Sequence, residues 1–225
     1  MSAKKNSKAG FDEHGFKLVL SGDYFQFDCS GCGDCCRNVR DSIMVESLDI
    51  YRLARFLGLE MSEVILRYTD TAFLAWGFPV FMLKTKEHQD ACIFLKDSRC
   101  SVQQVKPRTC RLYPLGVGPD DKGTGEWLNF IVSKKQHHFK GRRRNVGDWV
   151  SENLTPDERA FVIADYNYAG ELARLIKAVG KRHEDRIIEL ILFFKYTAFD
   201  MPEDFQPQYT RNMEQLKKQL KALIR

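Results

Sequence analysis

The 225-residue chain carries 35 basic and 30 acidic residues, for a net charge of +5, and 44% of its residues are hydrophobic. A chain of this length buries a core without disulfides or metal to compensate for small size, and its composition excludes the disordered and fibrous classes. The mild positive charge does not by itself predict binding to nucleic acid.

The N-terminal segment, residues 1–15, is predicted to be a disordered basic tail, because its start is lysine-rich and lacks the apolar centre of a secretory signal. The most apolar later stretch, Ile187 to Phe194, is too short and too closely flanked by charges to cross a bilayer. We therefore expect a soluble, cytoplasmic protein with no membrane contact. In that reducing compartment a cysteine cluster is more often a metal or redox centre than a set of disulfides.

Short strands are expected first along the chain, at 16–20 and 24–27, joined as a small hairpin by the turn Ser21-Gly22-Asp23. Two helices follow, one capped by Ser47 and stopped by Gly58, and one beginning at Ser62. Further strands are predicted at 78–83, 91–95 and 127–132. Together they would form a small antiparallel sheet.

From about Gly147 the pattern is helical, with helices predicted at 148–153, 156–179, 184–199 and 208–224. In the second of these, apolar residues recur at three and four positions and predict a buried stripe of Leu172, Leu175, Ile176 and Val179. The expected fold class is α+β, predominantly α-helical, with a small antiparallel sheet next to a cysteine-rich metal-binding core. The expected domains are a cysteine-cluster domain over 16–150 and a helical C-terminal extension over 151–225, packed on it.

The chain's cysteines all lie in its first half and form two groups. In the first, two-residue spacings let successive thiolates curl around one centre, and Gly31 and Gly33 permit the tight turns that this requires. The second group arrives from far along the sequence and supplies more thiolates to the same shell. We predict that all seven bind metal: Cys29, Cys32, Cys35, Cys36, Cys92, Cys100 and Cys110.

The identity of the metal is less constrained than the presence of a centre. The spacing of Cys29, Cys32 and Cys35 matches the three-cysteine run of bacterial ferredoxins, which favours an iron–sulfur cluster, 4Fe-4S in first place. Zinc is the alternative, because thiolate pairs with distant partners also build structural zinc sites. The adjacent Cys35 and Cys36 are expected to diverge. Seven thiolates exceed the four that one zinc ion or one cubane needs, so a second metal, a larger cluster or spare cysteines stay open.

Arginines stand next to the cysteines in both groups. A cluster of thiolates and sulfides is negatively charged, and nearby guanidinium groups would stabilise it. Arg37, Arg108 and Arg111 are therefore predicted to contact the cofactor. The alternative is that such arginines are ordinary surface residues paired with Asp34 or Asp41.

The order of these elements resembles a known family. Cys-x2-Cys-x2-Cys-Cys, then Cys-x-Phe-Leu, then Lys-Pro-Arg-Thr-Cys-Arg-Leu-Tyr-Pro is similar to the YkgJ family of cysteine-cluster proteins, described as zinc- or iron-chelating domains. Members usually have Arg-Pro where this chain has Lys106-Pro107, and many carry one more cysteine further on. Here that region contains His137 and His138. The resemblance suggests one of them as a replacement nitrogen ligand, and a solvated histidine pair is the alternative.

Three functions follow as expectations. The first is a metal-binding protein that acts in redox chemistry or metal handling. The second is implied by the resemblance, since the family includes the flagellin lysine N-methylases: an iron–sulfur-dependent protein lysine N-methyltransferase, whose catalytic residues the sequence does not identify. The third is a zinc-stapled module that recognises a protein or RNA. A protein partner or substrate is expected, and the basic segment Lys134 to Arg144 is where nucleic acid would bind, although a solvated loop is the commoner outcome.

Overall fold

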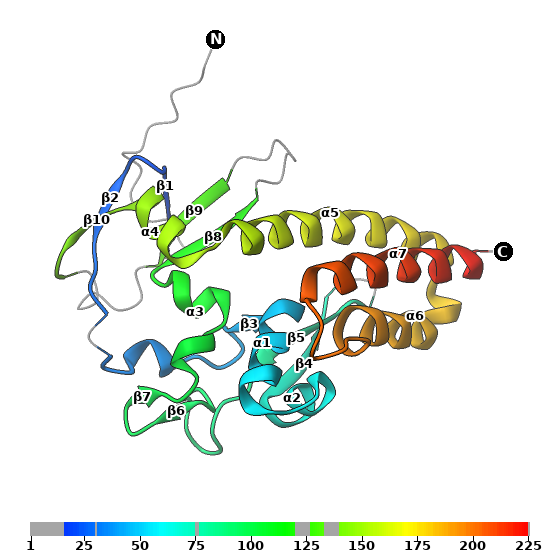
Figure 1. Ribbon diagram of the computed structural model, residues 1–225, viewed down its shortest axis with the longest axis horizontal. Coiled ribbons are helices and arrows are strands. Elements are labelled where there is room, and N and C mark those ends of the chain that lie inside the picture. Colours follow the sequence, from blue (N-terminus) through cyan, green and yellow to red (C-terminus); the bar gives the residue numbers. More distant parts are fainter. Residues whose placement is uncertain (1–15, 30, 75–76, 120–126, 133–139, 225) are drawn as a thin grey trace, which may run out of the picture. The chain divides into compact units, whose positions relative to one another are not determined.

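The computed structural model describes residues 16–29, 31–74, 77–119, 127–132 and 140–224 (Figure 1). The chain divides into two compact units, each assembled from two separate stretches of sequence. Unit 1 contains Met1–Cys32 and Arg108–Ile163, and unit 2 contains Gly33–Pro107 and Ala164–Arg225. The expected N-terminal tail lies outside the described residues, and the expected domain boundary at residue 150 stays a prediction.

Unit 1 contains an antiparallel sheet in the order β1-β9-β8, formed by β1 (Phe16–Val19), β9 (Trp127–Val132) and β8 (Leu115–Pro119). A separate ladder pairs β2 (Tyr24–Gln26) with β10 (Arg143–Asn145). The strands predicted around the first turn are thus present, but the predicted hairpin between them is wrong. Each of them pairs instead with a strand from far along the chain, which buries Val19 and Phe25 in a common core.

The core of unit 1 is formed by strands and by two short helices, α3 (Arg108–Leu112) and α4 (Val146–Asn153). Trp149 of α4 packs against this core and meets the ring edges of Phe25 and Phe27, with centroid distances of 6.1 and 5.4 Å. The buried members are Val19, Phe25, Phe27, Leu112, Leu115, Val117, Ile131, Val146 and Leu154. The strand that leads to Cys29 and the helix that contains Cys110 therefore share one core.

Unit 2 begins with the 3-10 helix η1 (Asp34–Cys36) and a sheet in the order β3-β5-β4. Its strands are β3 (Met44–Val45), β5 (Pro79–Leu83) and β4 (Thr69–Phe73), and the helices between them are α1 (Ser47–Leu57) and α2 (Met61–Tyr68). Both predicted helices are confirmed, but the capping residues are glutamates. Glu46 and Asp49 form a capping box at α1, and Glu60 and Glu63 form one at α2. Gly58 ends α1 in the left-handed conformation at φ 66°, as predicted.

The stretch 91–95 is not the strand that the sequence predicts. Ala91 and Cys92 form isolated bridges, and a hairpin follows in which β6 (Leu95–Lys96) pairs with β7 (Arg99–Cys100). The hairpin turn consists of Asp97 and Ser98, both at positive φ, 48° and 60°. A two-residue turn with two positive φ angles usually contains glycine or asparagine. The Asp97-Ser98 turn contains neither, so this hairpin was not predicted from the sequence. The short helix η3 (Gln103–Val105) closes this part of unit 2.

The C-terminal stretch is helical, as predicted. It contains α5 (Pro156–Val179), η5 (Lys181–His183), α6 (Glu184–Ile191), the π-helix η6 (Leu192–Thr197) and α7 (Phe205–Leu223). The stripe on α5 is buried at Leu172, Ile176 and Val179, while Leu175 is half-buried. The fold is thus α+β and predominantly helical, with small antiparallel sheets. Among the helices of the described ranges, none is both long enough and apolar enough to cross a membrane.

The π-helix η6 buries a charged side chain. Lys195 is 4% exposed, and its ammonium group donates to Asp165 Oδ1, which also accepts from the Tyr209 hydroxyl. Burial is the largest single influence and disfavours the ammonium. The charge and the hydrogen bond of Asp165, helped by the charges of Tyr196 and Glu46, together outweigh it and raise the pKa of Lys195 above its ordinary value. The pKa of the neighbouring Tyr196 rises to about 12, chiefly through burial. The ion pair is therefore kept charged inside unit 2.

Replacing this lysine tests how much unit 2 depends on the pair. Lys195→Met leaves the Asp165 carboxylate without its cation and should lower the free energy of unfolding by about 3 kcal/mol. Arg186→Gln is the matched control, because the Arg186–Glu189 pair is exposed on both sides and its loss should cost under about 1 kcal/mol. Urea denaturation of both variants measures the difference, and equal midpoints would contradict the prediction.

Candidate metal centre

Two cysteines lie on the short helix η1. Gly33 precedes it in the left-handed conformation at φ 75°, and Cys36 N donates to Gly33 O at 3.0 Å. The turn brings Cys35 Sγ and Cys36 Sγ to 4.0 Å from one another, so these side chains do not diverge as expected. Two thiolates on a tetrahedral zinc ion lie about 3.8 Å apart, which follows from zinc–sulfur bonds of about 2.3 Å. The spacing of this pair is thus close to what a shared ion needs.

Backbone hydrogen bonds bring two more cysteines to this helix. Cys92 N donates to Cys36 O at 2.8 Å, and the adjacent Ala91 bridges Arg37. Cys92 O accepts from Leu95 N at 2.9 Å, and Leu95 pairs with Cys100 across the β6–β7 hairpin. A series of backbone hydrogen bonds and one strand pairing therefore connects Cys36, Cys92 and Cys100, although these segments are separated in sequence.

The thiols of Cys92 and Cys100 favour the uncharged state. Burial raises the pKa of Cys92. A hydrogen bond from the Phe94 backbone lowers this pKa in part, and the negative charges of Cys100 and Cys35 raise it again. Burial likewise raises the pKa of Cys100, with a smaller contribution from the charge of Cys35. A bound cation would reverse this preference, because a metal deprotonates the thiols that coordinate it.

The donor type and one spacing fit a thiophilic metal, but the side chains are not in a closed ligand arrangement. Across the described ranges, no three or more His, Cys, Asp or Glu side chains are grouped so that they could hold a metal ion. Unit 2 nevertheless contains Cys35, Cys36, Cys92 and Cys100, which is the number of thiolates that a structural zinc ion or a cubane requires.

The remaining three cysteines belong to unit 1. Cys29 and Cys32 are exposed in the segment after β2, and Cys110 is half-buried in α3. Their role as ligands stays a prediction. His137 and His138, the suggested nitrogen ligands, lie outside the described residues.

The arginines beside the cysteines have partners within their own units. Arg37 contacts Asp34 Oδ1 at 3.4 Å and donates to Ser98 Oγ at 3.1 Å. Asp34 is one of the two aspartates expected as partners if these arginines are ordinary surface residues. Arg108 donates to Val117 O at 2.7 Å. Arg111 makes two hydrogen bonds to Glu158, at 3.1 and 2.6 Å.

Glu158 was not foreseen from the sequence. It is 2% exposed and also accepts from Thr155 N at 2.7 Å, at the start of α5. Arg111 thus neutralises a buried carboxylate in unit 1. The predicted contact of the three arginines with a cofactor stays a prediction.

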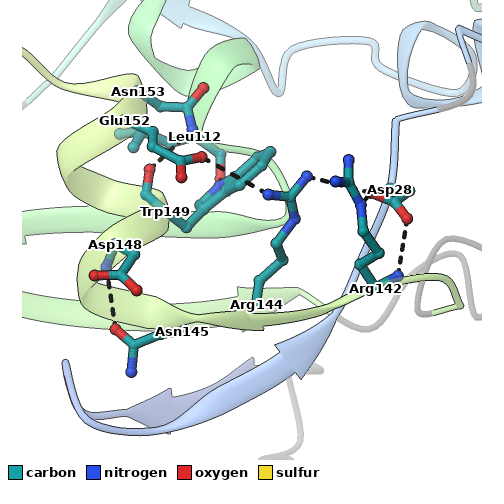
Figure 2. Close-up of polar contacts among 9 residues, drawn as sticks. All are labelled: Asp28, Leu112, Arg142, Arg144, Asn145, Asp148, Trp149, Glu152 and Asn153. Carbon is teal, nitrogen blue, oxygen red and sulfur yellow. Dashed lines mark hydrogen bonds and ion pairs between the residues drawn. The ribbon is translucent and has the colours of Figure 1, made fainter.

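Asp28 is the functional candidate that sequence reasoning missed. It directly precedes Cys29 and accepts hydrogen bonds from Arg142 and Arg144, both in the segment that was considered for nucleic acid (Figure 2). The backbone amide of Arg142 is the main cause that lowers the pKa of Asp28 below its usual value. Part of the basic segment is therefore engaged by a carboxylate of the same unit. Residues 134–139 of this segment lie outside the described ranges.

Comparisons with known proteins agree with the cysteine chemistry. A family model described as "CxxCxxCC: Putative zinc- or iron-chelating domain" matches residues 28–137. An uncharacterized protein of Methanocaldococcus jannaschii is 32% identical over 115 residues, which cover 50% of this chain and 54% of that protein. The chain thus spans about half the length of this curated relative. No solved structure matches.

Two glycines of the cysteine run provide a matched test of the loop. An added Cβ at Gly33 would lie 2.6 Å from Ser98 O, whereas an added Cβ at Gly31 meets nothing within 4 Å. Both glycines have positive φ, so alanine carries the same backbone penalty at each. We expect Gly33→Ala to lower the free energy of unfolding by roughly 2 kcal/mol more than Gly31→Ala, because a backbone oxygen cannot move aside. Urea denaturation of the metal-free proteins checks this, and equal losses would show that the contact is unimportant.

Proposed function

From the match of residues 28–137 to the family model of zinc- or iron-chelating domains, we propose that the protein holds metal through the thiolates of its seven cysteines. An iron–sulfur cluster, 4Fe-4S in first place, is the proposed cofactor, and zinc is the alternative. The proposed role is redox chemistry or metal handling.

One observation carries the proposal: in unit 2, backbone contacts connect three cysteines from distant segments, and a fourth lies beside the first of them. Cys92 is hydrogen-bonded to the backbone of Cys36, Cys100 follows across a hairpin, and the Sγ atoms of Cys35 and Cys36 lie 4.0 Å apart. If these cysteines were only small apolar residues, packing alone would explain Cys92, which is 7% exposed. It would not explain why Cys35, Cys36 and Cys100, which are all partly exposed, gather beside it.

The proposed cluster would carry negative charge, and an arginine stands next to one of its proposed ligands. Arg37 follows Cys36 directly, and its guanidinium is held by Asp34 and Ser98 within the same unit. A fixed cation of this kind favours thiolates and influences the reduction potential of a cluster. A bound iron–sulfur cluster would supply one-electron transfer, whereas zinc has no redox chemistry and would serve as a structural link.

The methyltransferase activity that the resemblance implies stays a prediction. The matched region covers the cysteine core, and the curated relative is uncharacterized and matched over about half of its length. Substrate, partner and reaction therefore need direct measurement.

Anaerobic purification decides between the two cofactors. We expect a coloured protein that contains iron and acid-labile sulfide, because the spacing of Cys29, Cys32 and Cys35 matches a cluster-binding run. Absorption spectra and metal analysis on the same sample check this. A colourless protein with stoichiometric zinc would reject the cluster in favour of the alternative, and a metal-free protein that takes up neither would reject both.

Variants at Cys92 separate a ligand from a buried apolar residue. Cys92→Ser and Cys92→Ala should both lose most of the bound metal, because neither side chain offers a thiolate. Cys92→Ala, which keeps the site apolar, should cost only about 1 kcal/mol in the metal-free protein. Ser101→Ala is the control, since it removes a nearby hydroxyl that donates to Phe94 O and leaves every thiol in place. Full metal content in both Cys92 variants would remove this residue from the ligand set.

A further inference from the structure

The carboxylate of Asp28 is clamped at the entrance to the cysteine run. Its Oδ2 accepts from Arg142 N at 2.8 Å, and its Oδ1 accepts from Arg142 Nε at 3.1 Å and from Arg144 Nη2 at 3.2 Å. Figure 2 shows the carboxylate beside these two arginines. The peptide that leads to Cys29 is thus tied to the segment before and within β10.

Glycine is required where the chain approaches this carboxylate. Gly141 has φ 101°, and an added Cβ would lie 2.7 Å from Asp28 Oδ2. Only a residue without a side chain lets the Arg142 amide reach Asp28 from this direction. The close approach of backbone to carboxylate therefore depends on a specific residue choice, unlike an ordinary exposed ion pair.

Arg144 also faces α4. Its guanidinium lies 5.4 Å from the centroid of the Trp149 ring, and its Nη1 is 3.9 Å from Glu152 Oε2. Trp149 in turn donates from Nε1 to Leu112 O at 3.1 Å (Figure 2). Leu112 is the last residue of α3, two positions after Cys110. A chain of contacts therefore runs from Asp28, next to Cys29, through Arg144 and Trp149 to the helix of Cys110.

We propose that Arg144 is a positioning residue that holds the segments of Cys29 and Cys110 in fixed register, so that the thiols of these two residues take part in metal binding. This inference rests on the proposed function. Arg144 touches neither thiol in the contacts described, and it acts through Asp28 on one side and Trp149 on the other. The planar guanidinium suits this role because it can donate to a carboxylate while it stacks on an aromatic ring.

A positioning role for Arg144 and a merely stabilising role predict effects of different size on metal binding and on the free energy of unfolding. Asp28 and Arg144 side chains are 37% and 24% exposed, and exposed ion pairs add little to stability. The core of unit 1 is built from other residues and should stay folded without the clamp. Residues that orient metal ligands, by contrast, change metal affinity by about 10- to 100-fold when they are replaced.

Site-resolved alkylation of the full chain tests the inference. Each protein is loaded anaerobically, with Zn²⁺ in one series and with ferrous iron and sulfide in another, and treated with iodoacetamide before mass spectrometry. In the wild type, loading should protect Cys29 and Cys110 as well as the unit 2 cysteines. In Arg144→Gln, modification of Cys29 and Cys110 should rise at least about tenfold while Cys92 and Cys100 stay protected.

Two further variants make the test specific. Arg144→Lys keeps the positive charge but loses the planar fork, so it should fail to restore protection. Arg143→Gln removes the same charge one residue away, from a side chain that stacks over Tyr24 at 4.0 Å, and should behave as the wild type. Circular dichroism and urea midpoints of the metal-free variants should match the wild type.

Each contrary result has a distinct meaning. If the wild type binds metal and the Arg144→Gln variant protects Cys29 and Cys110 as well as the wild type does, the positioning role is wrong. It is also wrong if Arg144→Lys restores protection fully, or if loading never protects Cys29 and Cys110 while it protects Cys92 and Cys100. Failure of the wild type to bind either metal or protect any cysteine would overturn the proposed function, and this inference with it.

Discussion

The hydrogen bond from Cys92 N to Cys36 O is the contact on which the arrangement of unit 2 depends. It joins two cysteine segments that lie far apart in sequence, and the bridge between Arg37 and Ala91 continues it on one side. A backbone bond fixes position more firmly than a thiol can, because main-chain groups must be paired when they are buried. The backbone therefore fixes the spacing of these two cysteine segments.

This arrangement explains how the protein can be folded and still respond to metal. Without a cation, burial keeps Cys92 and Cys100 protonated, so the thiols pack as small apolar groups rather than as repelling charges. A metal ion bound by these thiols, as proposed, would replace those protons, which would couple its binding to proton release. The large helical core, with buried residues such as Ile50, Leu172 and Met213, does not need the metal for its own packing.

Much of the fold could be predicted from the sequence because its signals were local. Apolar periodicity and the glycines that end helices were enough to predict α1, α2 and α5, and α5 has the predicted bounds. Pairing could not be predicted in the same way. β1 and β2 looked like a hairpin, yet each binds a strand more than a hundred residues away, and no local pattern encodes such a choice.

The candidate site shows the same limit. The cysteines and their arginines are visible in the sequence, but their partners are not: Glu158 for Arg111, and Asp28 for Arg142 and Arg144, come from distant segments. The adjacent Cys35 and Cys36 were expected to diverge, and only the 3-10 turn after Gly33 brings them near one another. Unit 2 is also completed late, since Tyr51 of α1 donates to the carbonyls of Met201 and Glu203. On the ribosome, all seven cysteines therefore emerge before the C-terminal helices that complete unit 2, so the nascent chain carries every thiol before this unit can finish folding.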